Sequence, residues 1–186
     1  MGTGHDHETT EHEKTEEETP AMATTASYTV PGMSSDDTKA VIETLSERLA
    51  SLIDLTLTLK HVHWNVVGED FISVHRMLDP QVDAVRKMVD DTAERIATLG
   101  GTPYGTPGAV VEIRTWDDYS LGKAPVPEHL AALDRVYAGV IEDHRKAQQQ
   151  FSEQDPVSED LIIGHLRELE LFQWFIRAHL ENSGGS

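Results

Sequence analysis

The stretch from His63 to Glu94 constrains this chain more than any other, because it carries metal-binding side chains at helical spacing. Asp79 follows His75 by four residues and Glu94 follows Asp90 by four, which places each pair on one helix face. At about 100° per residue, these four side chains fall within an arc of about 100°. A nitrogen-rich end and a carboxylate end together favour a borderline metal such as Fe(II) over calcium or magnesium.

The length of this stretch predicts a site shared between two chains. Asp79 and Asp90 are eleven residues apart, which corresponds to roughly 16 Å along a helix axis. Metal–ligand bonds are about 2 Å long, so the two ends cannot hold one ion within one chain, even if Pro80 kinks the helix. Two copies packed antiparallel about a two-fold axis bring one chain's histidine end against the other's carboxylate end. We therefore expect a dimer with two equivalent sites between its subunits.

A solvated helix face is the alternative interpretation of these acids. Asp and Glu at four-residue spacing are common on exposed helices, and Asp90 has Arg86 and Lys87 nearby as ionic partners. The full array argues against this interpretation, because the acids lie beside an apolar stripe and not opposite one. The stripe consists of Val74, Leu78, Val82, Val85, Val89, Ala93 and Ile96.

The spacing H-W-N at His63, H-x3-D at His75 and D-x3-E at Asp90 resembles the ferroxidase signature of the Dps family. These proteins are the miniferritins that protect DNA in starved bacteria. The resemblance runs from about Val41 to Glu181 and includes the closing pattern LFQWFIRAHLE. KHVHWNVVG and TPGAVVEIRTWDDYS are similar to the actinobacterial branch of the family.

The resemblance implies an all-α, ferritin-like four-helix bundle with one long crossover carrying a short helix. It also implies a shell of twelve subunits built from two-fold dimers. The ferroxidase site would hold two irons between subunits, with hydrogen peroxide as oxidant, although the spacing does not distinguish peroxide from dioxygen. Ferric ion would then mineralise on an acidic inner surface, which protects DNA from oxidative damage. The implied catalytic and metal-binding residues are His63, His75, Asp79, Asp90 and Glu94.

Apolar periodicity predicts the four long helices within a domain spanning residues 34–182. A serine cap at Ser34 or Ser35 begins the first helix, and Gly100 ends the second. The connection over residues 100–127 is unusually long for a compact bundle and matches the crossover, with a short helix expected around Trp116. The predicted helices cover about residues 34–64, 71–99, 127–153 and 157–181.

Two side chains beside His63 leave alternatives open. Trp64 either lies next to the metals, where it intercepts oxidising equivalents, or packs in the core. His61 is two residues from His63 and lies on nearly the opposite helix face, so only one of the two histidines points at the site. The resemblance selects His63.

The segments outside the bundle are predicted to be disordered tails, at residues 1–33 and 183–186. Residues 1–20 carry seven acids and one lysine, a net charge of −6, with almost nothing apolar. His5, His7 and His12 give this acidic arm at most a weak metal affinity. The chain has no cysteine, no apolar leader and no membrane-length apolar run, so we expect a cytoplasmic protein.

Acids gather where the third predicted helix passes to the fourth. In Dps shells, acids near this corner line a three-fold pore that admits iron. Pro156 stands where an acid is expected, so only Asp155 and Asp160 carry over as possible pore residues. A solvated turn is the competing interpretation of these acids.

Three other functions compete with the miniferritin. A larger ferritin or bacterioferritin needs a Glu-x-x-His motif, and none of the ten histidines has Glu three residues before it. A nucleoid-associated protein that binds and compacts DNA needs cationic tails, whereas this chain carries a net charge of −18. Direct DNA binding at neutral pH is therefore doubtful. An inert helical scaffold does not account for the ligand array.

Overall fold

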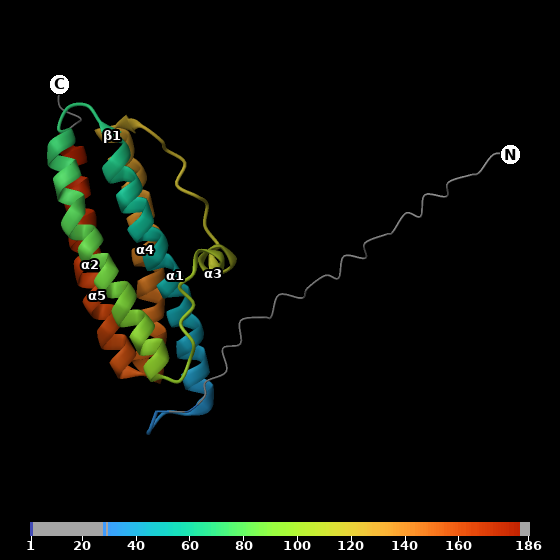
Figure 1. The fold of residues 1–186 in the computed structure, drawn as a ribbon. Helices are drawn as coiled ribbons and strands as arrows, with labels where there is room; N and C mark the ends of the chain where they lie inside the picture. Colours follow the sequence, from blue (N-terminus) through green and yellow to red (C-terminus); the bar gives the residue numbers. More distant parts are fainter. Residues whose placement is uncertain (2–27, 29, 183–186) are drawn as a thin grey trace.

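The computed structural model describes residue 1, residue 28 and residues 30–182, which fold as a four-helix bundle with a long crossover (Figure 1). This confirms the all-α, ferritin-like fold class. Most of the two predicted tails, including His5, His7 and His12, lies outside the described residues. The bundle helices are α1 (Ser35–Asn65), α2 (Phe71–Thr98), α4 (Val126–Gln154) and α5 (Pro156–Asn182).

The four helices form two hairpins. α1 packs against α2 and α4 packs against α5, and contacts between α1 and α4 and between α2 and α5 join the hairpins into one bundle. The short turn after α1 places the end of that helix beside the start of α2. His63, near the end of α1, and His75, near the start of α2, therefore meet at one end of the bundle.

The helix ends follow local capping chemistry. The Ser34 side chain accepts a hydrogen bond from the Asp37 amide at 3.0 Å, which confirms the predicted start of α1. Gly100 has φ of 88° just after α2, a left-handed conformation that glycine adopts without steric cost. Asp70 precedes α2 with φ of 60°. The chain thereby turns sharply between α1 and α2.

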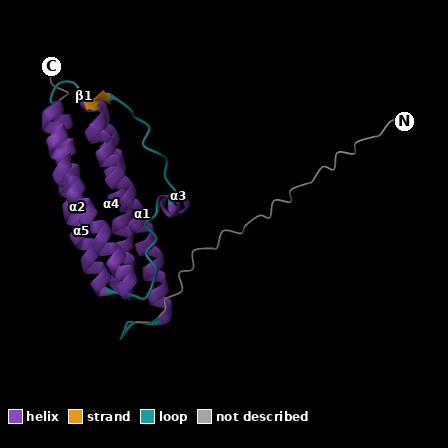
Figure 2. Cartoon of the chain, viewed as in Figure 1, coloured by secondary structure: helices purple, strands orange, loops and turns teal. Residues whose placement is uncertain are grey.

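The crossover carries a short helix, but the predicted position around Trp116 was wrong. α3 spans Pro107–Ile113 and ends before Trp116. It begins at Pro107 because the Thr106 side chain caps its first turn and proline suits the first position of a helix. Two strands missed by the sequence analysis, β1 (Val66–Val67) and β2 (Ala124–Pro125), pair in parallel and tie the crossover to the end of α1 (Figure 2).

The apolar core runs along the whole bundle and draws on all four long helices. Tyr137 is fully buried and donates a hydrogen bond from its hydroxyl to the side-chain oxygen of Gln81, 2.8 Å away. Pro80 lies inside α2, and the helix continues through it to Thr98. Within the part of the chain that the structure describes, no helix has the length and apolar composition required to cross a membrane.

Candidate metal site

The histidine end of the site is built by α1 and α2 together. The rings of His63 and His75 stack with centroids 3.7 Å apart. His63 Nδ1 lies 3.0 Å from the carbonyl oxygen of His75, and His75 Nδ1 lies 2.9 Å from the carbonyl oxygen of His63. A carbonyl only accepts, so each Nδ1 carries the proton and donates it, which leaves each Nε2 with a free lone pair. Metal-binding histidines are commonly oriented in this way.

Asp79 adds a carboxylate to the histidine end. Its Oδ1 lies 3.3 Å from His63 Nδ1 and 3.1 Å from the ammonium of Lys60. The hydrogen bond from Lys60 is the main cause that lowers the pKa of Asp79 below its ordinary value. The structure therefore brings together three of the five predicted ligands, His63, His75 and Asp79, and adds a cation beside them.

Lys60 was missed by the sequence analysis, although a local signal was present. It stands three residues before His63, a spacing that places the two side chains on one helix face. Its partner Asp79 is nineteen residues further along the chain. Only the packing of α1 against α2 shows that the ammonium and this carboxylate meet.

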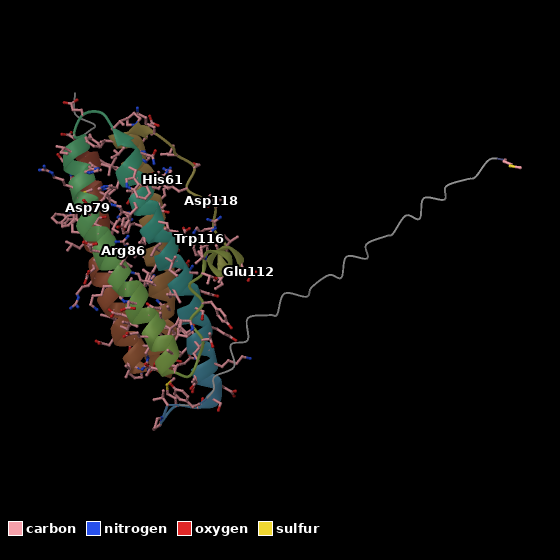
Figure 3. All side chains as sticks on the ribbon, in the orientation of Figure 1. His61, Asp79, Arg86, Glu112, Trp116 and Asp118 are labelled. Atoms are coloured by element: carbon pink, nitrogen blue, oxygen red, sulfur yellow. The ribbon has the colours of Figure 1, made fainter. Side chains whose placement is uncertain are left out.

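The carboxylate end lies elsewhere on the same helix. Asp90 and Glu94 are both exposed on α2, which runs unbroken past Pro80. The rise of a straight helix therefore applies, and Asp79 and Asp90 are separated by roughly 16 Å along the axis of α2. His63, His75 and Asp79 are neighbours, yet within the described residues of a single chain no group of three His, Cys, Asp or Glu side chains, these three included, is arranged so that it could hold a metal ion. Figure 3 shows Asp79 on α2, away from the crossover.

Trp64 is exposed, so the prediction that its side chain packs in the core is wrong for the described chain. Its relative exposure is 71%, and the Lys60 ammonium lies 5.8 Å from the centroid of its ring. His61 points away from the histidine end, as expected from its spacing, and its Nε2 lies 2.7 Å from the carbonyl oxygen of Leu121 in the crossover.

The two predicted pore residues differ in their surroundings. Asp155 is only 4% exposed, and its carboxylate binds Arg95 and Ser158 and accepts from the first amides of α5. Burial opposes ionisation, but the bonds from Ser158 and Arg95 outweigh it and lower the pKa of Asp155. Asp155 is thus a buried helix cap whose charge is already paired, which argues against a place in a pore lining. Asp160 is exposed.

Comparisons with known proteins find similar sequences and a similar fold. The model of the ferritin-like domain matches residues 42–183. The DNA protection during starvation protein of Mycolicibacterium smegmatis is 58% identical, over 86% of this chain and 87% of that protein. A protein of the same name from Agrobacterium fabrum is 37% identical, over 76% of this chain and 88% of its own length.

A solved structure extends the comparison to the fold. DpsA14 from Streptomyces coelicolor superposes with a TM-score of 0.84 at 59% identity, covering 87% of this chain and 96% of that one. Identity at this level over nearly the whole bundle, together with the ferritin-like match, shows the family. The chain belongs to the Dps family of ferritin-like proteins.

Proposed function

We propose that this protein is an iron-storing ferroxidase whose site is shared between two subunits of a homo-oligomer, expected to be a dodecamer in the cytoplasm. Membership of the Dps family supports iron storage and protection of DNA, and the name of the Mycolicibacterium smegmatis relative states protection of DNA during starvation for that protein. The observation that carries the proposal is the pair of histidines whose Nδ1 atoms are tied to carbonyl oxygens, which leaves both Nε2 atoms available to a metal.

Each residue has a distinct role towards Fe(II), the substrate. His63 binds one iron together with Asp90 of the partner subunit and Glu94 of the partner subunit, which also reaches the second iron. His75 and Asp79 bind that second, weaker iron directly or through water. The hydrogen bond from Lys60 favours the ionised form of Asp79, which is the form that binds iron.

The oxidation is a two-electron reduction of hydrogen peroxide. Two Fe(II) ions each give one electron, two protons are taken up, and two waters and two Fe(III) ions result. Because both electrons come from one site, peroxide is reduced directly to water and no hydroxyl radical is released. Fe(III) prefers oxygen ligands, so the product leaves the histidines for acidic groups on the inner surface of the shell.

A complementation experiment tests the shared site. His63→Ala and Asp90→Ala chains, each nearly inactive alone, are unfolded together and reassembled. In a mixed dimer, one site inherits both lesions and the other combines an intact histidine side with an intact carboxylate side. If half of the dimers are mixed, about a quarter of all sites recover. The measurement is Fe(II) binding and oxidation per subunit as the mixing ratio varies, with recovery greatest at equal amounts.

The matched control mixes His63→Ala with His75→Ala. Both lesions lie on the histidine side, so every site in that mixture keeps one lesion and no activity returns. Mixed assemblies are verified by native mass spectrometry. If verified mixtures of His63→Ala and Asp90→Ala oxidise no more iron than the separate variants, the site shared between subunits is wrong.

A further inference from the structure

Two histidines meet inside the bundle, between α4 and α5. The rings of His144 on α4 and His165 on α5 lie with their centroids 6.0 Å apart and their planes at 58°. His144 is fully buried and His165 is 4% exposed. Arg48, whose charge acts on His144, stands fifteen residues before His63 on α1, roughly 22 Å along the helix axis. The pair therefore lies well apart from the candidate metal site.

Three ring nitrogens of this pair have no partner. His144 Nδ1 lies 2.8 Å from the carbonyl oxygen of Val140, so it carries the proton and leaves a lone pair on Nε2. That Nε2 and both ring nitrogens of His165 are buried without a hydrogen-bond partner in the described part of the chain. Buried polar atoms are rarely left unpaired, and an unmodelled ion is one reason for the exception. His144 thus repeats the arrangement of His63 and His75, with one nitrogen tied to a carbonyl and the other available.

Neither imidazole is protonated at neutral pH. Burial lowers the pKa of His144 to about 3 and that of His165 to about 4, helped at His144 by the charge of Arg48. A proton therefore does not compete with a metal for the lone pairs. Two cations and two carboxylates act on the pair, namely Arg48, Lys87, Asp91 and Asp143. Because these charges cancel, the surroundings favour an ion of single charge, since the cost of burying an ion rises steeply with its charge.

The separation of the two rings fits one ion held in line by two nitrogens. A metal–nitrogen bond is about 2 Å long and a ring nitrogen lies roughly 1 Å from its ring centre, so a linear arrangement places the centroids about 6 Å apart. A tetrahedral angle at the metal would bring them to about 5 Å. Among the described residues, no third His, Cys, Asp or Glu joins the pair in a metal-binding group. Zn(II) and Fe(II) prefer four or more ligands, whereas the soft ion Cu(I) is stable with two nitrogens.

We propose that His144 and His165 bind one Cu(I) ion between them, as a linear two-nitrogen site inside each subunit. Nε2 of His144 and the unprotonated ring nitrogen of His165 each supply one lone pair, which gives the buried nitrogens the partner that they lack. Because both rings are buried, the ion enters as the chain folds or when α4 and α5 separate locally. Burial then keeps peroxide away from the copper, so the site withholds a second metal that generates radicals.

Competition for Cu(I) without oxygen tests the site. The full-length protein with His63→Ala and His75→Ala, which lacks the histidines of the proposed ferroxidase site, is refolded with Cu(I) and titrated with bathocuproine disulfonate, a coloured Cu(I) chelator. We expect one Cu(I) per subunit to be retained. Adding His144→Leu or His165→Leu lowers the affinity by about 100-fold or more, because loss of a ligand costs at least as much as loss of a group that only orients one.

A matched variant separates the pair from buried histidines in general. His129→Leu, made in the same protein, removes another fully buried histidine of α4, which contacts Tyr119, and leaves the Cu(I) affinity unchanged. Circular dichroism checks the folding of each variant. Cu(I) held by folded His144→Leu as tightly as by the protein with both core histidines overturns the proposal, as does a failure of that protein to retain copper against the chelator.

X-ray absorption at the copper edge keeps the test independent of the folding of the leucine variants. In the copper-loaded protein with His63→Ala and His75→Ala, we expect two nitrogens at about 2 Å and the strong pre-edge feature of linear Cu(I). A spectrum of three- or four-coordinate copper contradicts the linear site. Every protein in this experiment lacks the histidines of the proposed ferroxidase site, so the outcome does not depend on that function.

Discussion

The histidines of this chain have three different roles, and the groups that contact their ring nitrogens distinguish these roles. His63 and His75 direct Nδ1 to carbonyl oxygens, and we propose that Nε2 of each binds iron. His129 presents a nitrogen to a phenol. His144 and His165 face each other inside the bundle, with ring centroids 6.0 Å apart. The residue type alone does not separate these roles, because each depends on a group from another element.

The two core histidines make the fold sensitive to acid. Burial, helped by the charge of Arg48, lowers the pKa of His144 to about 3, and burial lowers the pKa of His165 to about 4. Asp143 near His144 and Asp91 near His165 oppose these shifts, whereas Lys87 adds to that of His165. His144 Nε2 and both ring nitrogens of His165 are buried and have no hydrogen-bond partner among the residues that the structure describes.

We predict that acid destabilises the bundle through these two histidines. In the unfolded chain they titrate near 6.5, so between about pH 6.5 and pH 4 the unfolded state binds more protons than the folded state. Their contribution to stability is complete above this window and is lost as the pH falls, by about 1.4 kcal/mol per pH unit for each histidine.

Urea unfolding at a series of pH values and fixed protein concentration measures this slope. His165→Leu removes one titrating group, so its free energy of unfolding declines less steeply between pH 6 and pH 4 (roughly one proton fewer). Ile162→Val, a substitution at a buried position of the same helix that does not titrate, serves as the control and leaves the slope unchanged. An unaltered slope in His165→Leu contradicts the prediction.

At the scale of elements, the start of α5 separates a structural acid from a candidate functional one. Asp155 caps α5 and holds Arg95 of α2, so it joins two helices of different hairpins. Asp160 lies one and a half turns further on and is exposed. The sequence analysis grouped the two acids by proximity along the chain, whereas the tertiary structure assigns them different surroundings.

Asp155→Asn is expected to destabilise the fold. The amide still caps the helix but no longer neutralises the buried guanidinium of Arg95, and loss of one partner from a buried ion pair costs about 3 kcal/mol. Asp160→Asn, at an exposed position, changes stability by less than about 0.5 kcal/mol. Urea midpoints of both variants at one protein concentration check the contrast. Equal midpoints contradict the structural role of Asp155.

Asp160→Asn also tests the proposed pore. If Asp160 lines an iron entrance, removing its charge weakens the field that concentrates cations, and iron oxidation slows at low Fe(II) while the ferroxidase sites stay intact. The rate loss shrinks at high ionic strength, because salt screens the same field. Glu112→Gln on α3 is the control for loss of an exposed charge. Initial rates equal to those of the control at every ionic strength assign Asp160 to the solvated surface of α5.

At the scale of the whole molecule, net charge determines the affinity of the protein for DNA. The chain carries −18, and binding to duplex DNA depends mainly on cations that neutralise phosphates. We therefore predict no gel shift of duplex DNA at neutral pH and ordinary salt without divalent ions. Protection of DNA then arises from removal of iron and peroxide, not from coating. A shift that weakens as salt rises would favour the alternative of direct compaction.

The sequence by itself determined the four long helices and the spacing of the metal ligands, because both depend on local periodicity and capping. The four-residue spacing in α2 and the serine cap of α1 can be recognised in the sequence without knowledge of the fold. The same local chemistry at Thr106 and Pro107 marks the start of α3, yet the sequence analysis placed the short helix around Trp116.

Only the tertiary structure decided which groups meet across elements. Lys60 reaches Asp79, Arg95 reaches Asp155, and Tyr119 reaches His129, each through packing that no local pattern encodes. The two-residue strands β1 and β2 are likewise too short to show a period of their own. Local periodicity specifies elements, whereas the partner of a side chain depends on how those elements pack.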